Sequence, residues 1–206
     1  MARDWFRNTA WSERIERAFL DKLKRSRTQR DQQVAIQAIT LTETRPDAAL
    51  KLAQFYFETR KSKFDDARVH SAVATAKLNL GDLDGALAAY RSVLEAEEVT
   101  PGVKTNAFVE YPYLVATRGV RAEYERALAV LDANADEIVF PVVQFMWSAA
   151  YALIAASQGR RALAKEHAAT ALQSADKEQS GFRYHKALGL VGEQHEYTIK
   201  RLRAVA

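Results

Sequence analysis

The 206-residue sequence contains no cysteine, which excludes disulfide bonds, iron–sulfur clusters and thiol nucleophiles. Proline and glycine are also scarce, and the four prolines and eight glycines lie between helix-like stretches more often than inside them. Few segments alternate Val, Ile or Thr with polar residues as β-strands do. Long runs rich in Ala, Leu, Glu and Arg are present instead, and they predict an all-α protein.

Long apolar runs are missing as well. The nearest candidate, residues 138–157, is interrupted by Pro141, Gln144 and several small residues, so it predicts a buried helix and not a membrane span. The first residues, MARDWFRNTAW, are charged and lack the apolar stretch of a secretory signal. We therefore expect a cytoplasmic protein without a membrane partner.

The net charge of +4 is distributed unevenly along the chain. Residues 1–30 carry nine Lys and Arg against four Asp and Glu, and residues 181–206 carry five against two. The segment between them holds sixteen basic and twenty acidic residues. Basic ends therefore flank a mildly acidic body.

The clearest local pattern predicts a pair of antiparallel helices in residues 67–98. Small and apolar residues recur three and four positions apart on both sides of a turn at residues 80–82, as one face of each helix requires. At that turn, Gly81 can end the first helix in the left-handed conformation, and the Asp82 side chain can cap the second. The stretch is typical of a helical hairpin.

This hairpin belongs to a series. Turn signals at Arg45-Pro46, Gly81, Gly119 and Gly159 lie 36, 38 and 40 residues apart. A helical pattern follows each turn, with an apolar or small residue expected five and nine positions after the turn residue. These positions are Leu50 and Gln54, Ala86 and Tyr90, Tyr124 and Leu128, and Ala164 and Ala168, of which Gln54 fits least well. Four such signals in register predict a repeat array, in which each hairpin buries its apolar face by stacking on the next.

The best-preserved unit resembles a tetratricopeptide (TPR) repeat, through Ala74, Gly81, Asp82, Ala86, Tyr90 and Leu94. The resemblance is good over residues 67–98 and partial over 145–174, and elsewhere only the spacing is similar. The residues His70, Val73 and Lys77 and the long period depart from the family pattern, so the chain resembles a degenerate member. Its start, DWFRNTAW, also resembles uncharacterised bacterial repeat proteins.

The resemblance implies a right-handed α-solenoid of about four helical hairpins in a single domain, residues 1–206. An amphipathic helix at about residues 8–26 is expected to cap the N-terminal end, within residues 1–28. The hairpins are placed at 29–60, 64–98, 101–135 and 138–175. The tail, 176–206, is expected to fold back as a C-terminal cap, because the last hairpin would otherwise expose Met146, Ala149, Leu153 and Ala156.

In TPR proteins, partners usually bind along a concave wall formed by the first helix of each pair. Carried onto this sequence, the resemblance implies a partner-binding face made of Gln32, Arg68, Ser71, Thr75, Asn79, Asn106, Tyr113 and Thr117. We therefore predict a non-enzymatic scaffold that binds a protein or peptide.

Tyr113 has two interpretations. It follows Pro112, whose missing N–H predicts a kink or a break in the helix. Its ring is either a packed aromatic beside that kink or, near Arg118, a hot spot for a peptide.

A first alternative function is nucleic-acid binding by the basic N-terminal helix and the C-terminus. The N-terminal cations could contact phosphates while Trp5, Phe6 and Trp11 stack on bases. The competing interpretation is a solvated helix face with Trp11 in the core. Interleaved acids such as Glu13 and Glu16 favour that second interpretation because they neutralise the basic stripe.

A second alternative is an enzyme or metal site around His185, Glu193 and His195. The sequence HEYTI at 195–199 begins like a zinc-protease helix, but Ile199 stands where the second histidine ligand is needed. The sequence also lacks a phosphate-binding glycine loop and a nucleophile elbow. We therefore expect no cofactor and no metal, and we favour histidines that hydrogen-bond the tail to the last hairpin.

Overall fold

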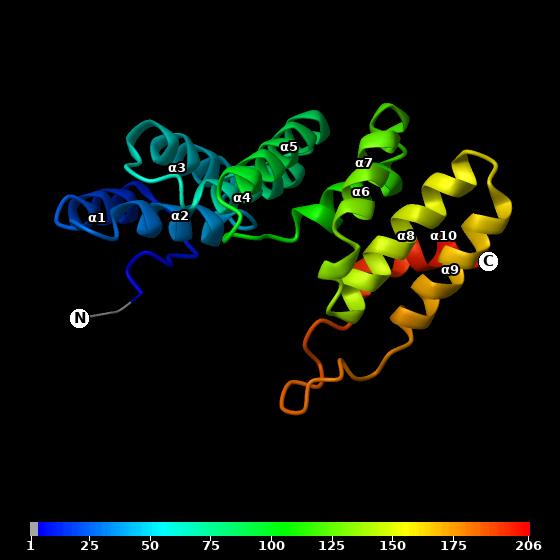
Figure 1. Ribbon diagram of the computed structural model, residues 1–206. Coiled ribbons are helices and arrows are strands. Elements are labelled where there is room, and N and C mark those ends of the chain that lie inside the picture. The colour runs from blue at the N-terminus through cyan, green and yellow to red at the C-terminus, as the bar shows by residue number, and fades with distance from the viewer. Residues whose placement is uncertain (1–3) are drawn as a thin grey trace. The chain divides into compact units, whose positions relative to one another are not determined.

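The computed structural model describes residues 4–206 and consists of helices joined by turns and loops (Figure 1). Helices account for 68% of the chain and no strand occurs among the described residues, which confirms the all-α prediction. The chain divides into two compact units, Met1–Ala107 and Phe108–Ala206. No helix within residues 4–206 combines the length and the apolar character needed to cross a membrane.

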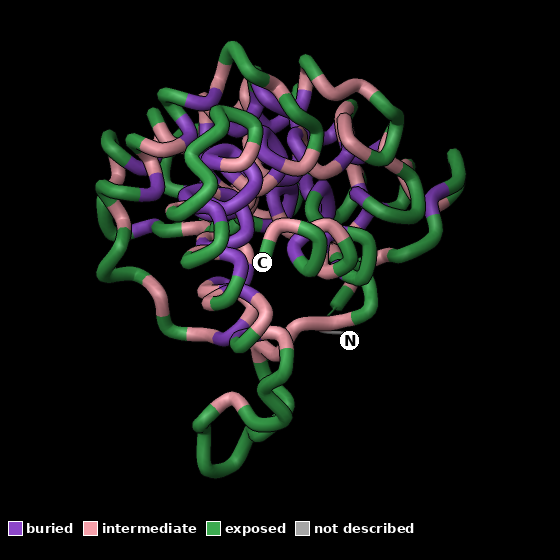
Figure 2. The backbone as a smooth tube through the Cα atoms, turned by 90° about the vertical axis from the view of Figure 1, so that its right-hand side faces the viewer, coloured by how far each residue is buried: buried purple, intermediate pink, exposed green. Residues whose placement is uncertain are grey.

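The described part of the first unit contains α1 (Glu13–Leu23), α2 (Arg30–Leu41), α3 (Pro46–Thr59), α4 (Asp66–Asn79) and α5 (Leu83–Val99). Helices that are consecutive in the chain pack on each other from α2 to α5, and α2 also contacts α4. The core of this unit is one cluster to which α1 contributes Phe19 and Leu23, α2 contributes Leu41 and α3 contributes Tyr56. Figure 2 shows such buried residues within the helices.

The predicted turn between α4 and α5 is confirmed in atomic detail. Gly81 has a φ of 78°, a conformation that is unfavourable for residues with a Cβ. The Asp82 carboxylate accepts a hydrogen bond from the Gly85 N–H at 2.8 Å and lies 2.7 Å from Lys77 Nζ. These local interactions end α4 and begin α5 at the positions that the sequence indicates.

The first helix begins later than predicted. Ser12 caps α1 by accepting a hydrogen bond from the Ile15 N–H, so residues 8–11 precede the helix. Asn8 instead pairs with the fully buried Gln37 of α2, whose side-chain oxygen accepts hydrogen bonds from both the backbone and the side chain of Asn8. Gln37 Nε2 donates in return to the Asn8 carbonyl at 2.8 Å. A buried amide therefore fixes the segment before α1.

The second unit contains α6 (Ala107–Arg118, its first residue belonging to the first unit), α7 (Tyr124–Ala133), α8 (Pro141–Ser157), α9 (Arg161–Ala175) and α10 (Glu196–Arg203). Short 3₁₀ turns precede α7, α8 and α10 at Arg121–Glu123, Ala135–Glu137 and Glu193–His195. Gly119 and Gly159 follow α6 and α8 with φ values of 69° and 75°, which confirms both predicted turns.

Helix α6 continues through Pro112, so of the predicted kink or break, the break does not occur. The missing N–H costs about 3 kcal/mol in a helix interior. Ending the helix there would instead expose Tyr111, Leu114 and Val115, which are buried. Burying each such side chain contributes roughly 1.5–3 kcal/mol, so continuation of the helix is favoured.

The tail folds back onto the last hairpin, as predicted. After the loop at residues 176–192, which is exposed over most of its length, α10 packs against α9 and α8. Leu202 of α10 and Ala149 of α8 are fully buried, and Leu153 of α8 is nearly so. The Val142 N–H also donates to the Gly189 carbonyl at 2.8 Å, which fixes the end of the loop to the start of α8.

Candidate functional site

Five of the eight predicted partner-binding residues lie on α2 and α4 of the first unit: Gln32, Arg68, Ser71, Thr75 and Asn79. With Ile39, which is 41% exposed and two helical turns from Gln32, they form what we call the α2–α4 face. Asn79 Nδ2 donates to the Thr42 carbonyl at 2.8 Å, so the C-terminal ends of the two helices are directly joined. Asn106 is exposed in the loop before α6.

Side chains of this face combine polar and apolar groups. Arg68 Nη1 lies 2.8 Å from the buried Asp65 carboxylate, and its guanidinium is 5.6 Å from the centre of the exposed Phe64 ring. The Thr75 hydroxyl donates to the Ser71 carbonyl one turn earlier. Arg68 is thus held in place at the N-terminal end of α4 while 43% of its side chain remains exposed.

Tyr113 and Thr117 of the second unit contact the chain's own C-terminal segment and are partly buried. The Tyr113 hydroxyl donates to Thr198 Oγ1 and also hydrogen-bonds His195 Nδ1, both at 2.8 Å. Arg201 Nη1 donates to the Thr117 carbonyl at 2.8 Å. Tyr113 is therefore a packed aromatic that anchors the tail.

His195 is the buried member of the predicted histidine site. It is 8% exposed, its ring contacts those of Tyr113 and Phe145, and burial lowers its pKa. His185 and Glu193 are exposed. Within residues 4–206 no three His, Cys, Asp or Glu side chains are placed to hold a metal ion together.

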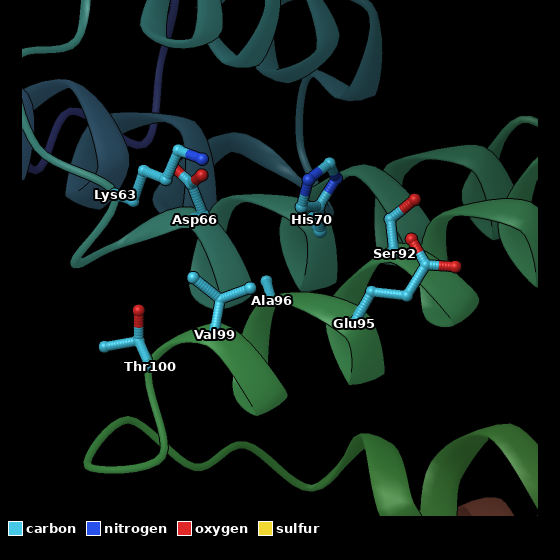
Figure 3. Close-up of a pocket in the computed structure, with 8 residues that line it drawn as sticks. All are labelled: Lys63, Asp66, His70, Ser92, Glu95, Ala96, Val99 and Thr100. Carbon is cyan, nitrogen blue, oxygen red and sulfur yellow. The ribbon is translucent and has the colours of Figure 1, made fainter.

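A groove between α4 and α5 is lined by polar and apolar side chains. It has a volume of about 190 Å³, below the 300–1,000 Å³ usual for ligand pockets. Figure 3 shows that α4 supplies Asp66 and His70 while α5 supplies Ser92 and Glu95.

The polar groups behind this groove contact one another. Asp66 Oδ1 lies 2.7 Å from Arg60 Nε and accepts a hydrogen bond from the Tyr56 hydroxyl at 3.1 Å. His70 stacks on Phe57 with ring centres 4.4 Å apart. Burial raises the pKa of Tyr56 and lowers that of His70. This buried network, which the sequence did not reveal, stabilises the α3–α4 junction.

The structure brings together only some of the cations and aromatics that the nucleic-acid alternative requires: Lys22 Nζ lies 5.7 Å from the centre of the Trp5 ring, and the Arg7 guanidinium lies 5.7 Å from that of Phe6. Trp11 is a core residue, 7% exposed, and Trp5 packs against Phe6 and Phe19 with ring centres about 5.5 Å apart. The cations at the end of α1 and the start of α2 line a different cavity, together with Lys61 from the loop after α3. Sequence reasoning missed Lys61, although the KSK stretch at 61–63 is a basic signal.

Comparison with known proteins assigns the chain to no family. No protein-family model matches it, and no curated protein or solved structure is significantly similar to it.

Proposed function

We propose that this chain is a non-enzymatic, TPR-like scaffold that binds a protein or peptide along the α2–α4 face. The observation that supports this most directly is the contact between α2 and α4, the first helices of two consecutive hairpins. Their common face carries half-exposed polar side chains and the exposed Ile39. First helices that line a shared surface are the arrangement through which TPR proteins bind partners.

The order in which the helices of the first unit pack is consistent with a solenoid of helical hairpins, whose right-handedness is implied by the TPR resemblance alone. In a solenoid each repeat contacts only its neighbours, so stability comes from helix pairs and from the interfaces between them. The pairs α2 with α3 and α4 with α5 follow this rule, and α3 with α4 provides the interface between pairs. Gly81, Gly119 and Gly159 end helices in the same conformation, as repeated units require.

The chemistry of the face favours a peptide with an acidic residue close to an apolar one. Arg68 keeps N–H donors available beyond its contact with Asp65, and arginine is common among residues that dominate binding energy. Ile39 supplies apolar area at the other helix, and Gln32 and Ser71 can hydrogen-bond a peptide backbone.

A display selection from a random peptide library, on the folded full chain, tests this proposal. Selected peptides are then measured against an Ile39→Glu/Ser71→Glu variant, which places two negative charges on the face. An Ala88→Glu/Ala122→Glu variant is the matched control, because it adds the same charge at exposed positions elsewhere. We expect the face variant to lose at least about tenfold in affinity and the control to retain it.

Two results would overturn the proposal. One is a selection that enriches no peptide binding the folded protein. The other is a set of peptides whose affinity falls equally in the face variant and in the control, because binding would then depend on net charge and not on the α2–α4 face.

A further inference from the structure

A cavity of about 660 Å³ lies between the loop that joins α1 to α2 and the loop that joins α3 to α4. Its volume is within the range of ligand pockets in proteins. Four cationic side chains line it: Lys24, Arg27, Arg30 and Lys61. Asp31 is the single acidic residue among the lining residues, so the described wall carries three net positive charges. We call this cavity the basic pocket.

Hydrogen bonds between the two loops hold the basic pocket in shape. Asp31 Oδ2 accepts hydrogen bonds from the backbone N–H groups of Lys61 at 2.6 Å and Ser62 at 3.2 Å. Arg30 Nη1 donates to Thr59 Oγ1 at 3.0 Å, and the guanidinium lies over the Phe55 ring at 5.1 Å. Segments about thirty residues apart in the chain are therefore fixed to each other before any ligand arrives.

Two of the cations in the pocket lack an internal counter-charge. Among residues 4–206, the side chains of Arg27 and Lys61 make no ion pair and no hydrogen bond. Lys24 pairs with Asp21 at 3.0 Å, but both side chains are mostly exposed, and such pairs are weak. Like charges that converge on one cavity repel one another, and a bound anion would relieve that repulsion.

The backbone adds to the same field. Helix α2 begins at Arg30, and its N-cap residue Gln29 makes no side-chain capping hydrogen bond. The first N–H groups of a helix carry partial positive charge and favour anions nearby. Hydroxyl groups of Ser26 and Thr28 also line the pocket and can donate to oxygen acceptors.

We propose that the basic pocket binds a small polyanion with two or more linked phosphate groups, such as the diphosphate or triphosphate part of a metabolite. Phosphate oxygens accept several hydrogen bonds at once, and the planar guanidinium groups of Arg27 and Arg30 match that geometry. A ligand with two to four negative charges balances the three net positive charges of the wall.

The residue types in the pocket favour a small ligand over single-stranded nucleic acid. Proteins that bind single strands combine a basic groove with aromatic side chains on which bases stack. No aromatic residue is among those that line the basic pocket, and Trp5 and Phe19 line another cavity. The pocket therefore supplies contacts for phosphates and none for bases.

Isothermal titration calorimetry of the full chain with inorganic tripolyphosphate tests this inference. We expect one saturable site that weakens as salt is added. An Arg27→Ala/Lys61→Ala variant should bind at least about tenfold more weakly, because it removes two charge-assisted contacts. A Lys51→Ala/Lys104→Ala variant loses the same charge at exposed positions elsewhere in the first unit and should bind like the wild type.

A single Arg27→Gln variant provides a second measurement that keeps the exposed loop polar and should also bind more weakly. The proposal fails if the titration shows no saturable site at low salt, or if the pocket and control variants lose affinity equally. It also fails if a twelve-nucleotide oligo-dT binds more tightly than tripolyphosphate and loses its affinity in the pocket variant, because the ligand would then be nucleic acid.

Discussion

Replacing Tyr113 by phenylalanine should loosen the C-terminal helix α10 without altering the packing around it. The substitution removes only the hydroxyl group, which hydrogen-bonds both Thr198 and His195. The ring remains and keeps its contacts with Phe145 and His195, whose centres lie 6.2 Å and 5.4 Å away. Any change in stability therefore reports the two hydrogen bonds.

The expected magnitude follows from what happens to the two partners. Thr198 and His195 are 5% and 8% exposed, so neither recovers a hydrogen bond from bulk water in the folded state. The threonine hydroxyl keeps its own proton and can rotate towards another acceptor, which limits its loss. The imidazole has no such substitute, and an unsatisfied buried polar group costs about 1–3 kcal/mol.

Hydrogen exchange measured by mass spectrometry on the peptide that covers residues 196–206 provides the assay. An eight-residue helix is not stable alone, so its amides exchange whenever α10 detaches. A loss of about 1–3 kcal/mol predicts exchange that is roughly 5- to 160-fold faster. Tyr197→Phe is the matched control, because Tyr197 lies on the same helix and is 73% exposed.

Unchanged exchange in Tyr113→Phe would refute the reasoning, because the hydroxyl would then not anchor α10. Equal acceleration in Tyr197→Phe would refute it as well, since an exposed hydroxyl has no buried partner to lose.

Three further predictions concern stability. Gly81→Ala should lower the free energy of unfolding by about 1–2 kcal/mol, because φ is 78° and a Cβ there would meet no other atom, so that only backbone strain contributes. Gly102→Ala, where φ is not positive, should have little effect, and urea denaturation compares the two variants. Asp66→Asn should lower the free energy of unfolding by about 2–3 kcal/mol, because it leaves the mostly buried Arg60 without a counter-charge. This is somewhat less than the loss expected for a fully buried ion pair, and a variant as stable as the wild type would contradict the prediction. Buried histidines with lowered pKa values bind fewer protons in the folded chain than in the unfolded chain below about pH 6.5. The urea concentration at the unfolding midpoint should therefore be constant above that pH and should fall as the pH decreases towards the folded-state pKa values. A midpoint equal at pH 7.5 and pH 5.5 would contradict the burial that lowers the pKa of His70, His167 and His195.

Much of the local structure is determined by the sequence alone. The turns at Gly81, Gly119 and Gly159 were predictable because the left-handed conformation that ends a helix excludes most other residues. The start of α3 at Pro46 has an equally local cause, since proline fits the first position of a helix. The apolar spacing of Phe19 and Leu23 likewise indicated which face of α1 is buried.

Tertiary contacts decided features that local rules predicted incorrectly or left open. Helix α1 begins only at Glu13 because Asn8 forms hydrogen bonds with Gln37, twenty-nine residues away in the chain. Pro112 stays inside a helix because the residues around it are buried. Local propensity is worth a few kcal/mol at most at such positions, and burial of neighbouring side chains outweighs it.

The candidate sites depend on the tertiary structure even more strongly. The sequence indicates polar residues on the first helices of the hairpins. Only the fold shows that Tyr113 hydrogen-bonds Thr198 of the C-terminal helix while Arg68 remains half exposed. The basic pocket requires Asp31 to hold a loop thirty residues away, and no pattern within a single helix contains that information. Helix ends are encoded within a few residues, because their hydrogen bonds and steric limits are local. Pockets and covered surfaces join distant segments, so only the packed chain determines them.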